Sequence, residues 1–71
     1  MTEKQLRFLP GNDIEFDYTN YKGERAFRRV MVIEVFYGTT PHHEGAQLFL
    51  LAYDFSKSDY RTFAMKDIHF N

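Results

Sequence analysis

Turn-forming residues divide this chain of 71 residues into five short segments, and this division restricts the fold more than any other feature. Gly, Pro, Asn, Asp and Ser gather at residues 10–13, 20–23, 38–46 and 56–59. The segments between these turns are rich in Val, Ile, Phe and Tyr, and they cover residues 13–18, 25–37, 47–53, 60–64 and 68–70. Such spacing favours strands, so we expect one all-β domain over residues 1–71.

The first segment alternates strictly between apolar and acidic residues. Ile14, Phe16 and Tyr18 fall on one face of an extended chain. Glu15 and Asp17 fall on the other face, where solvent keeps their carboxylates ionised. We therefore do not expect them to act in general acid–base catalysis. The pattern predicts a half-buried strand.

Two later segments are apolar on both faces. Residues 25–37 predict a long strand that bends, as strands do in small barrels. Residues 47–53 fit a central strand covered on both sides, and they also fit a strand with one face turned to a partner or a second copy of the chain. Because a barrel removes exposed edges, we expect a five-stranded antiparallel sheet that closes into a small barrel.

Composition excludes several kinds of protein. The chain has no Cys, which excludes disulfides, thiolate metal sites and a cysteine nucleophile. It has no apolar run of membrane-spanning length, and residues 1–10 lack the apolar stretch of a signal peptide, so we expect a cytoplasmic protein without a membrane partner. A net charge of −1 argues against binding nucleic acid through overall charge.

Catalysis has little support in the sequence. The only serines, Ser56 and Ser58, lie in a predicted turn, and no glycine-rich phosphate loop is present. His42 and His43 could ligate a metal together with His69, but no third ligand stands at a diagnostic spacing. We therefore expect no enzyme, no cofactor and no metal site, and we interpret residues 38–46 as a polar recognition loop carrying His42 and His43.

An ordered set of residues runs through the chain: Ile14, Phe16 and Tyr18, then Asn20, Gly23 and Glu24, Arg28 and Val30, the runs Leu48-Phe49-Leu50 and Ala52-Tyr53-Asp54, and finally Arg61, Phe63 and Ile68. Over residues 14–68 this set resembles the WYL domain family. The Trp-Tyr-Leu tripeptide of the family falls on residues 48–50, where its first two positions depart from the pattern but stay apolar. Val32 stands where the family commonly has Pro.

The resemblance implies an Sm-like or SH3-like barrel with a regulatory role, in which a ligand such as a nucleotide or single-stranded nucleic acid is sensed. The chain is similar to short free-standing proteins of this type from phages and prophages. Carried over residue by residue, ligand contact falls on Arg28, Phe49, Tyr53 and Arg61, with Phe49 lacking the hydroxyl of the family's Tyr.

Arg28 is also notable without the resemblance. Its neighbours on the same face of the strand, Ala26, Val30 and Val32, are apolar, so its guanidinium needs an anionic partner. That partner is either a ligand phosphate or a carboxylate of this chain, for which Glu24, Glu34 and Asp54 are the candidates. We expect a non-catalytic binding module in the first case. The alternative is a protein-interaction module that docks through residues 47–53 and the 38–46 loop.

Overall fold

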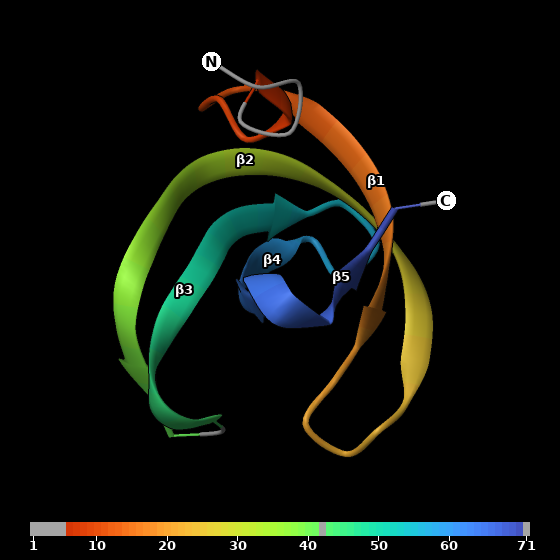
Figure 1. Ribbon diagram of the computed structural model, residues 1–71. Coiled ribbons are helices and arrows are strands. Elements are labelled where there is room, and N and C mark those ends of the chain that lie inside the picture. Colours follow the sequence, from red (N-terminus) through yellow and green to blue (C-terminus); the bar gives the residue numbers. More distant parts are fainter. Residues whose placement is uncertain (1–5, 42, 71) are drawn as a thin grey trace.

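The computed structural model describes residues 6–41 and 43–70, which form one antiparallel sheet (Figure 1). Its elements are β1 (Asp13–Thr19), β2 (Arg25–Thr40), β3 (His43–Asp54), β4 (Asp59–Ala64), the 3-10 helix η1 (Met65–Asp67) and β5 (Ile68–His69). The strands lie in the order β4-β3-β2-β1-β5. The prediction of an all-β, five-stranded antiparallel fold is confirmed.

The sheet curls around its inner face but does not close into a barrel (Figure 1). Within the described residues, β4 and β5 are the two edges, and β5 pairs with β1 only at Asp17 and Tyr18. The predicted closure is therefore wrong, because the two residues of β5 offer too few backbone groups to join two neighbours. A side chain bridges the gap: the Tyr18 hydroxyl accepts a hydrogen bond of 2.9 Å from the backbone N–H of Ala64.

Removing the Tyr18 hydroxyl should weaken this bridge. We expect Tyr18→Phe to lower the free energy of unfolding by about 1–3 kcal/mol at neutral pH, because the buried Ala64 N–H loses its acceptor. Urea unfolding followed by circular dichroism measures this loss. Equal stability of the two proteins would contradict the bridge.

The same pair of proteins carries a pH prediction. Burial raises the pKa of Tyr18 above its ordinary value of 10.0, with the Asp67 carboxylate adding to the effect and the Ala64 N–H and Arg28 opposing it. Above pH 10 the unfolded chain therefore ionises before the folded one, and the wild type loses stability as pH rises. Tyr18→Phe lacks this loss, so the difference in stability between the two proteins should narrow above pH 10.

The core fills the inner face of the curled sheet. It contains Ile14, Phe16, Tyr18, Val30, Val32, Leu50, Ala52 and Phe63. The alternation predicted for β1 is confirmed, since the apolar residues of this strand are at most 9% exposed. The Phe63 ring from β4 meets the rings of Phe16 and Tyr18 from β1 edge-on, with centroids 5.3 and 4.8 Å apart. These contacts hold β4 against β1 without a backbone ladder between the two strands.

The long bent strand predicted for residues 25–37 is confirmed as β2, which has 16 residues. Its register with β3 shifts between Val32 and Glu34, and such a bulge increases local twist and bending. β3 lies between β2 and β4, and its adjacent residues Phe49 and Leu50 are both fully buried although they point to opposite faces. The middle of β3 is therefore covered on both sides.

The recognition loop expected at residues 38–46 is largely strand. β2 continues to Thr40 and β3 begins at His43, so a long hairpin replaces most of the loop. Threonine is β-branched and favours strands, which helps to extend β2 through residues 39 and 40. His42 lies outside the described residues.

Helical structure in the described residues is confined to short turns. Leu6 and Arg7 form a helical turn before β1, and η1 has three residues. Over residues 6–41 and 43–70, no helix has the length and apolar character needed to cross a bilayer.

Candidate functional site

Arg28 and Arg61 line the same pocket, which has a volume of about 320 Å³. Arg28 lies on β2 opposite Phe16, and Arg61 lies on β4 opposite Ala52, so both start from the inner face of the sheet. The other lining residues are Tyr18, Asn20, Tyr21, Thr40, Thr62 and Phe63. The pocket thus lies where the β1–β2 turn, the tip of the β2–β3 hairpin and β4 approach one another.

Arg28 forms an ion pair with Asp54, the last residue of β3. Its Nη1 lies 3.1 Å from Asp54 Oδ2, and the Asp54 side chain is fully buried. The second carboxylate oxygen, Oδ1, accepts a hydrogen bond of 2.9 Å from the backbone N–H of Ser56. Of the partners considered for Arg28, the structure selects Asp54, so an internal carboxylate already balances this charge.

The ion pair leaves part of the Arg28 guanidinium unused. An arginine has five N–H donors, and Arg28 Nε is buried without a hydrogen-bond partner among the described residues. A buried donor without an acceptor costs about 1–3 kcal/mol. Nε is shielded from solvent, so a ligand in the pocket does not reach it as the side chain stands, and the contact that Arg28 can offer comes from the exposed 18% of its side chain.

Arg61 supplies the uncompensated charge. Its side chain is exposed, and no ion pair or hydrogen bond reaches it from the described part of the chain. The two guanidinium groups of Arg28 and Arg61, together with the carboxylate of Asp54, sum to a charge of +1. The pocket therefore favours an anion, although less strongly than two free arginines would.

Hydroxyl and aromatic groups complete the lining. The Tyr18 hydroxyl accepts from Ala64, and because burial raises the Tyr18 pKa, the phenol keeps its own proton at neutral pH. Tyr21 is 58% exposed, and the Lys22 ammonium lies 5.7 Å from its ring centroid. Together with Thr40 and Thr62, these residues place donors beside an exposed aromatic face.

The other two residues expected at the site do not line this pocket. Phe49 is fully buried with its ring tilted against Phe36, 5.5 Å between centroids, so it offers no surface to a ligand. Tyr53 shares its face of β3 and packs between the rings of Phe55 and Tyr60. The structure therefore brings together the two arginines and separates them from the two aromatic residues.

The histidines do not assemble into a site in the described residues. His69 on β5 lies with its Nε2 3.2 Å from Thr19 Oγ1, and His43 begins β3 opposite Thr40. No group of three or more His, Cys, Asp or Glu able to hold a metal ion occurs in the part of the chain that the structure describes.

The sequence interpretation missed the pocket's polar lining. Tyr18 is assigned to the core by alternation, which is correct but incomplete, because its hydroxyl end reaches the pocket. Asn20 belongs to the predicted turn and holds that turn through Oδ1, which accepts from the N–H groups of Lys22 and Glu24. The turn at residues 20–23 is followed closely in the sequence by Ala26 and Arg28, the first two residues of β2 on the inner face. This proximity of the turn to Arg28 was the available signal.

No protein-family model, curated protein or solved structure matches this chain.

Proposed function

We propose that this domain is a non-catalytic binding module that captures a small anionic ligand with a planar group, such as a nucleotide, in the pocket of Arg28 and Arg61. The observation that carries the proposal is the pair of arginines on one pocket, of which Arg61 has no counter-ion among the described residues. Guanidinium groups suit phosphate oxygens, and Tyr21 provides an exposed ring for stacking.

The size and charge of the pocket favour a single nucleotide unit over a long nucleic acid. Its volume of about 320 Å³ lies at the small end of the range for ligand pockets. The chain as a whole carries a charge of −1, which gives little attraction to a polyanion. A short single-stranded oligonucleotide would then engage the pocket through one terminal unit.

The proposal keeps the sensing role that the resemblance to WYL domains implies, but moves the aromatic contact from Phe49 and Tyr53 to Tyr21. It also treats the sheet as an SH3-like or Sm-like barrel that is open along one side. The strand order and the curvature of β2 support this view.

Titration with nucleoside monophosphates and a short oligothymidine tests the proposal. We expect binding at 50 mM salt, seen as changes in amide shifts at Tyr18, Tyr21 and Thr62, and weaker binding as salt rises. Arg61→Gln should weaken binding about ten- to a hundredfold, because a charge-assisted contact contributes about 1.5–3 kcal/mol. Stability should change little, since Arg61 is exposed.

Arg29→Gln is the matched control. Arg29 is also exposed and neighbours Arg28, but it points to the opposite face, where its guanidinium carbon lies 5.6 Å from the Phe55 ring centroid. This variant should bind as the wild type does. No binding by the folded wild type at 50 mM salt, or equal losses in the two variants, would rule out the proposed pocket.

A protein-interaction module is the second candidate function. Val35, Tyr37 and Leu48 are 38, 70 and 51% exposed and share one face of the β2–β3 hairpin, as their pairing with β3 requires. Such a patch is typical of contact with a partner or a second copy. Failure of every anion to bind, combined with self-association in sedimentation, would favour this function.

A further inference from the structure

β1 has an edge that its neighbours leave open. β2 pairs with this strand along its whole length, from Asp13 to Thr19. On the other side, β5 pairs only with Asp17 and Tyr18. Phe70 follows β5 at the register position opposite Phe16, and the two ring centroids lie 6.2 Å apart, so the edge without a neighbour among the described residues lies beside residues 13–15.

The direction of the backbone groups follows from the ladder itself. The Val32 N–H donates to the Asn12 carbonyl oxygen at 2.8 Å, and the Asn20 N–H donates to the Glu24 carbonyl oxygen at 2.8 Å. Because hydrogen-bonded positions alternate in an antiparallel ladder, even-numbered residues of β1 bond to β2. The N–H and C=O groups of Asp13 and Glu15 consequently point to the open edge.

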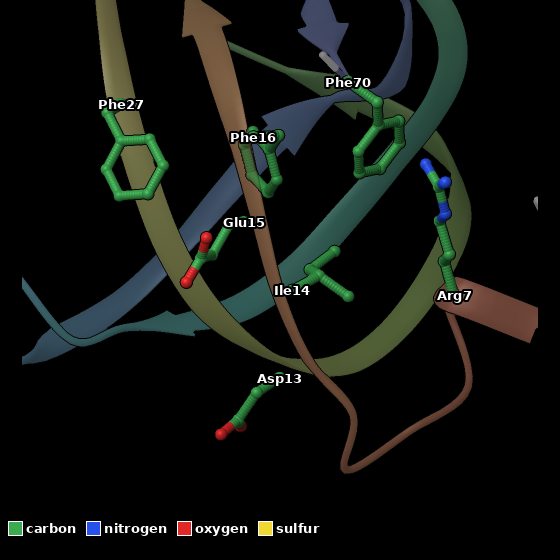
Figure 2. A pocket seen from close by; sticks show the side chains of 7 residues that line it. All are labelled: Arg7, Asp13, Ile14, Glu15, Phe16, Phe27 and Phe70. Atoms are coloured by element: carbon green, nitrogen blue, oxygen red, sulfur yellow. The ribbon is translucent and has the colours of Figure 1, made fainter.

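A groove of about 400 Å³ lies along this edge. Its lining includes four consecutive residues of β1, whose side chains alternate between the two faces, which places the groove beside the strand and not over one face. Figure 2 shows Glu15 and Phe27 on one side of β1 and Ile14 and Phe70 on the other. The groove thus has an acidic side and an apolar side, separated by backbone donors and acceptors. Arg7 also lines the apolar side, where its guanidinium carbon lies 4.5 Å from the Phe70 ring centroid.

The acidic side has one cationic neighbour, Arg29, which lies opposite Glu15 on β2 but places its guanidinium carbon 5.6 Å from the Phe55 ring centroid. Asp13 and Glu15 are exposed, and neither forms an ion pair within the described ranges. Asp17, in contrast, is paired with Arg25, whose Nη2 lies 3.2 Å from Asp17 Oδ2. Two free carboxylates at alternate positions attract a strand with basic side chains at the positions directly opposite.

We infer that the open edge of β1 binds an extended segment of a partner protein in which basic and apolar residues alternate. The segment adds a strand beside residues 13–15, with main-chain hydrogen bonds to Asp13 and Glu15. Its basic residues face these two carboxylates, and its apolar residues lie against Ile14 and Phe70. This site is separate from the pocket of Arg28 and Arg61 and does not depend on the function proposed for that pocket.

A second copy of this chain fits the edge poorly. Antiparallel pairing of two β1 strands about Ile14 would place Asp13 of each copy opposite Glu15 of the other. Like charges directly opposite each other destabilise a strand pair. The charge pattern therefore favours a basic partner segment over self-association.

The test uses an acetylated and amidated six-residue peptide that alternates lysine and valine. We expect binding that weakens with salt and weakens about three- to tenfold in Asp13→Asn or Glu15→Gln, since partly screened charge pairs contribute modestly. Glu34→Gln, which changes an exposed carboxylate outside the groove, should bind as the wild type does. N-methylation of the lysines, whose N–H groups face β1, should abolish binding, whereas N-methylation of the valines should not.

Hydrogen exchange measured by NMR locates the added strand. The amides of Asp13 and Glu15 should exchange more slowly when the peptide binds, while those of Ile14 and Phe16, already bonded to β2, should not change. Absence of peptide binding, or protection at other amides, would overturn the inference. Protection of the Asp13 and Glu15 amides from exchange in the absence of peptide would also overturn the inference. In a dimer this protection would identify a second copy as the occupant of the edge, and in a monomer it would identify the chain itself.

Discussion

Replacing Arg28 by methionine should lower the free energy of unfolding by about 3–5 kcal/mol, because it leaves a buried carboxylate without its ion-pair partner. Asp54 has no exposed surface, and its remaining contact is the hydrogen bond from the Ser56 N–H. Domains have about 0.05–0.15 kcal/mol of stability per residue, so this loss approaches the whole stability of 71 residues. Methionine keeps most of the apolar stem, which limits the change to the charge and its hydrogen bonds. Urea unfolding followed by circular dichroism measures the loss.

A double-mutant cycle with Asp54→Asn separates the ion pair from other effects. Asparagine keeps an oxygen that can accept from Ser56, and Arg28, with a side chain 18% exposed, can turn toward water. We therefore expect Asp54→Asn alone to cost less than Arg28→Met. The double variant should be more stable than the sum of the two losses predicts, by about 1–3 kcal/mol. Strictly additive losses would show that the two groups do not interact in solution.

Arg28 stabilises the fold through its ion pair with Asp54, and this role determines how the pocket can be studied. A variant at Arg28 loses stability and ligand contacts together. A loss of binding by such a variant therefore cannot be assigned to the lost contact or to the lost stability. Arg61 has no such structural role, because it is exposed and forms no ion pair or hydrogen bond with the described residues. Binding is therefore tested at Arg61 and folding at Arg28, and the two results can be interpreted separately.

The sequence predicts those parts of the fold that depend on local pattern. Alternation over residues 13–18 determines which side of β1 is buried, and the doubly apolar run over residues 25–37 indicates a long strand that bends. Closure of the barrel depends instead on the length of the last strand. β5 stops after His69, and nothing in the pattern of residues 68–70 distinguishes a strand that pairs once from one that pairs twice.

The candidate site is only half predictable for a related reason. An arginine among apolar neighbours indicates that Arg28 has an anionic partner, but the partner's identity depends on cross-strand register, which places Val30 opposite Asp54. Register also sets Arg61 opposite Ala52, on the face that Phe49 and Tyr53 do not share. A one-residue shift of β4 would have reversed this arrangement, and no local signal in residues 59–64 excludes it.

Replacing Phe63 by alanine should unfold most of the protein, because this ring joins β4 to β1 across the open side of a sheet that has no backbone closure. Phe63 is 3% exposed and contacts the rings of Phe16 and Tyr18. Truncation of a buried Phe costs about 3–5 kcal/mol, and aromatic pairs add about 0.5–1.5 kcal/mol each beyond area. The total of about 4–8 kcal/mol is comparable to the roughly 4–11 kcal/mol of stability expected for a domain of 71 residues. Circular dichroism at 25 °C should show loss of the native β signal and of a cooperative thermal transition.

Phe27→Ala provides the matched control for the same chemical change. Phe27 lies on β2 but is 60% exposed on the opposite face of the sheet, so its truncation should change the free energy of unfolding by no more than about 0.5 kcal/mol. Phe63→Leu, which retains apolar volume but loses the ring contacts, should fall between the two. If Phe63→Ala remained as stable as Phe27→Ala, the rings of β1 and β4 would not hold the open side together. The gap would then have to be spanned by other contacts, of which the hydrogen bond from Ala64 to Tyr18 is the first to test.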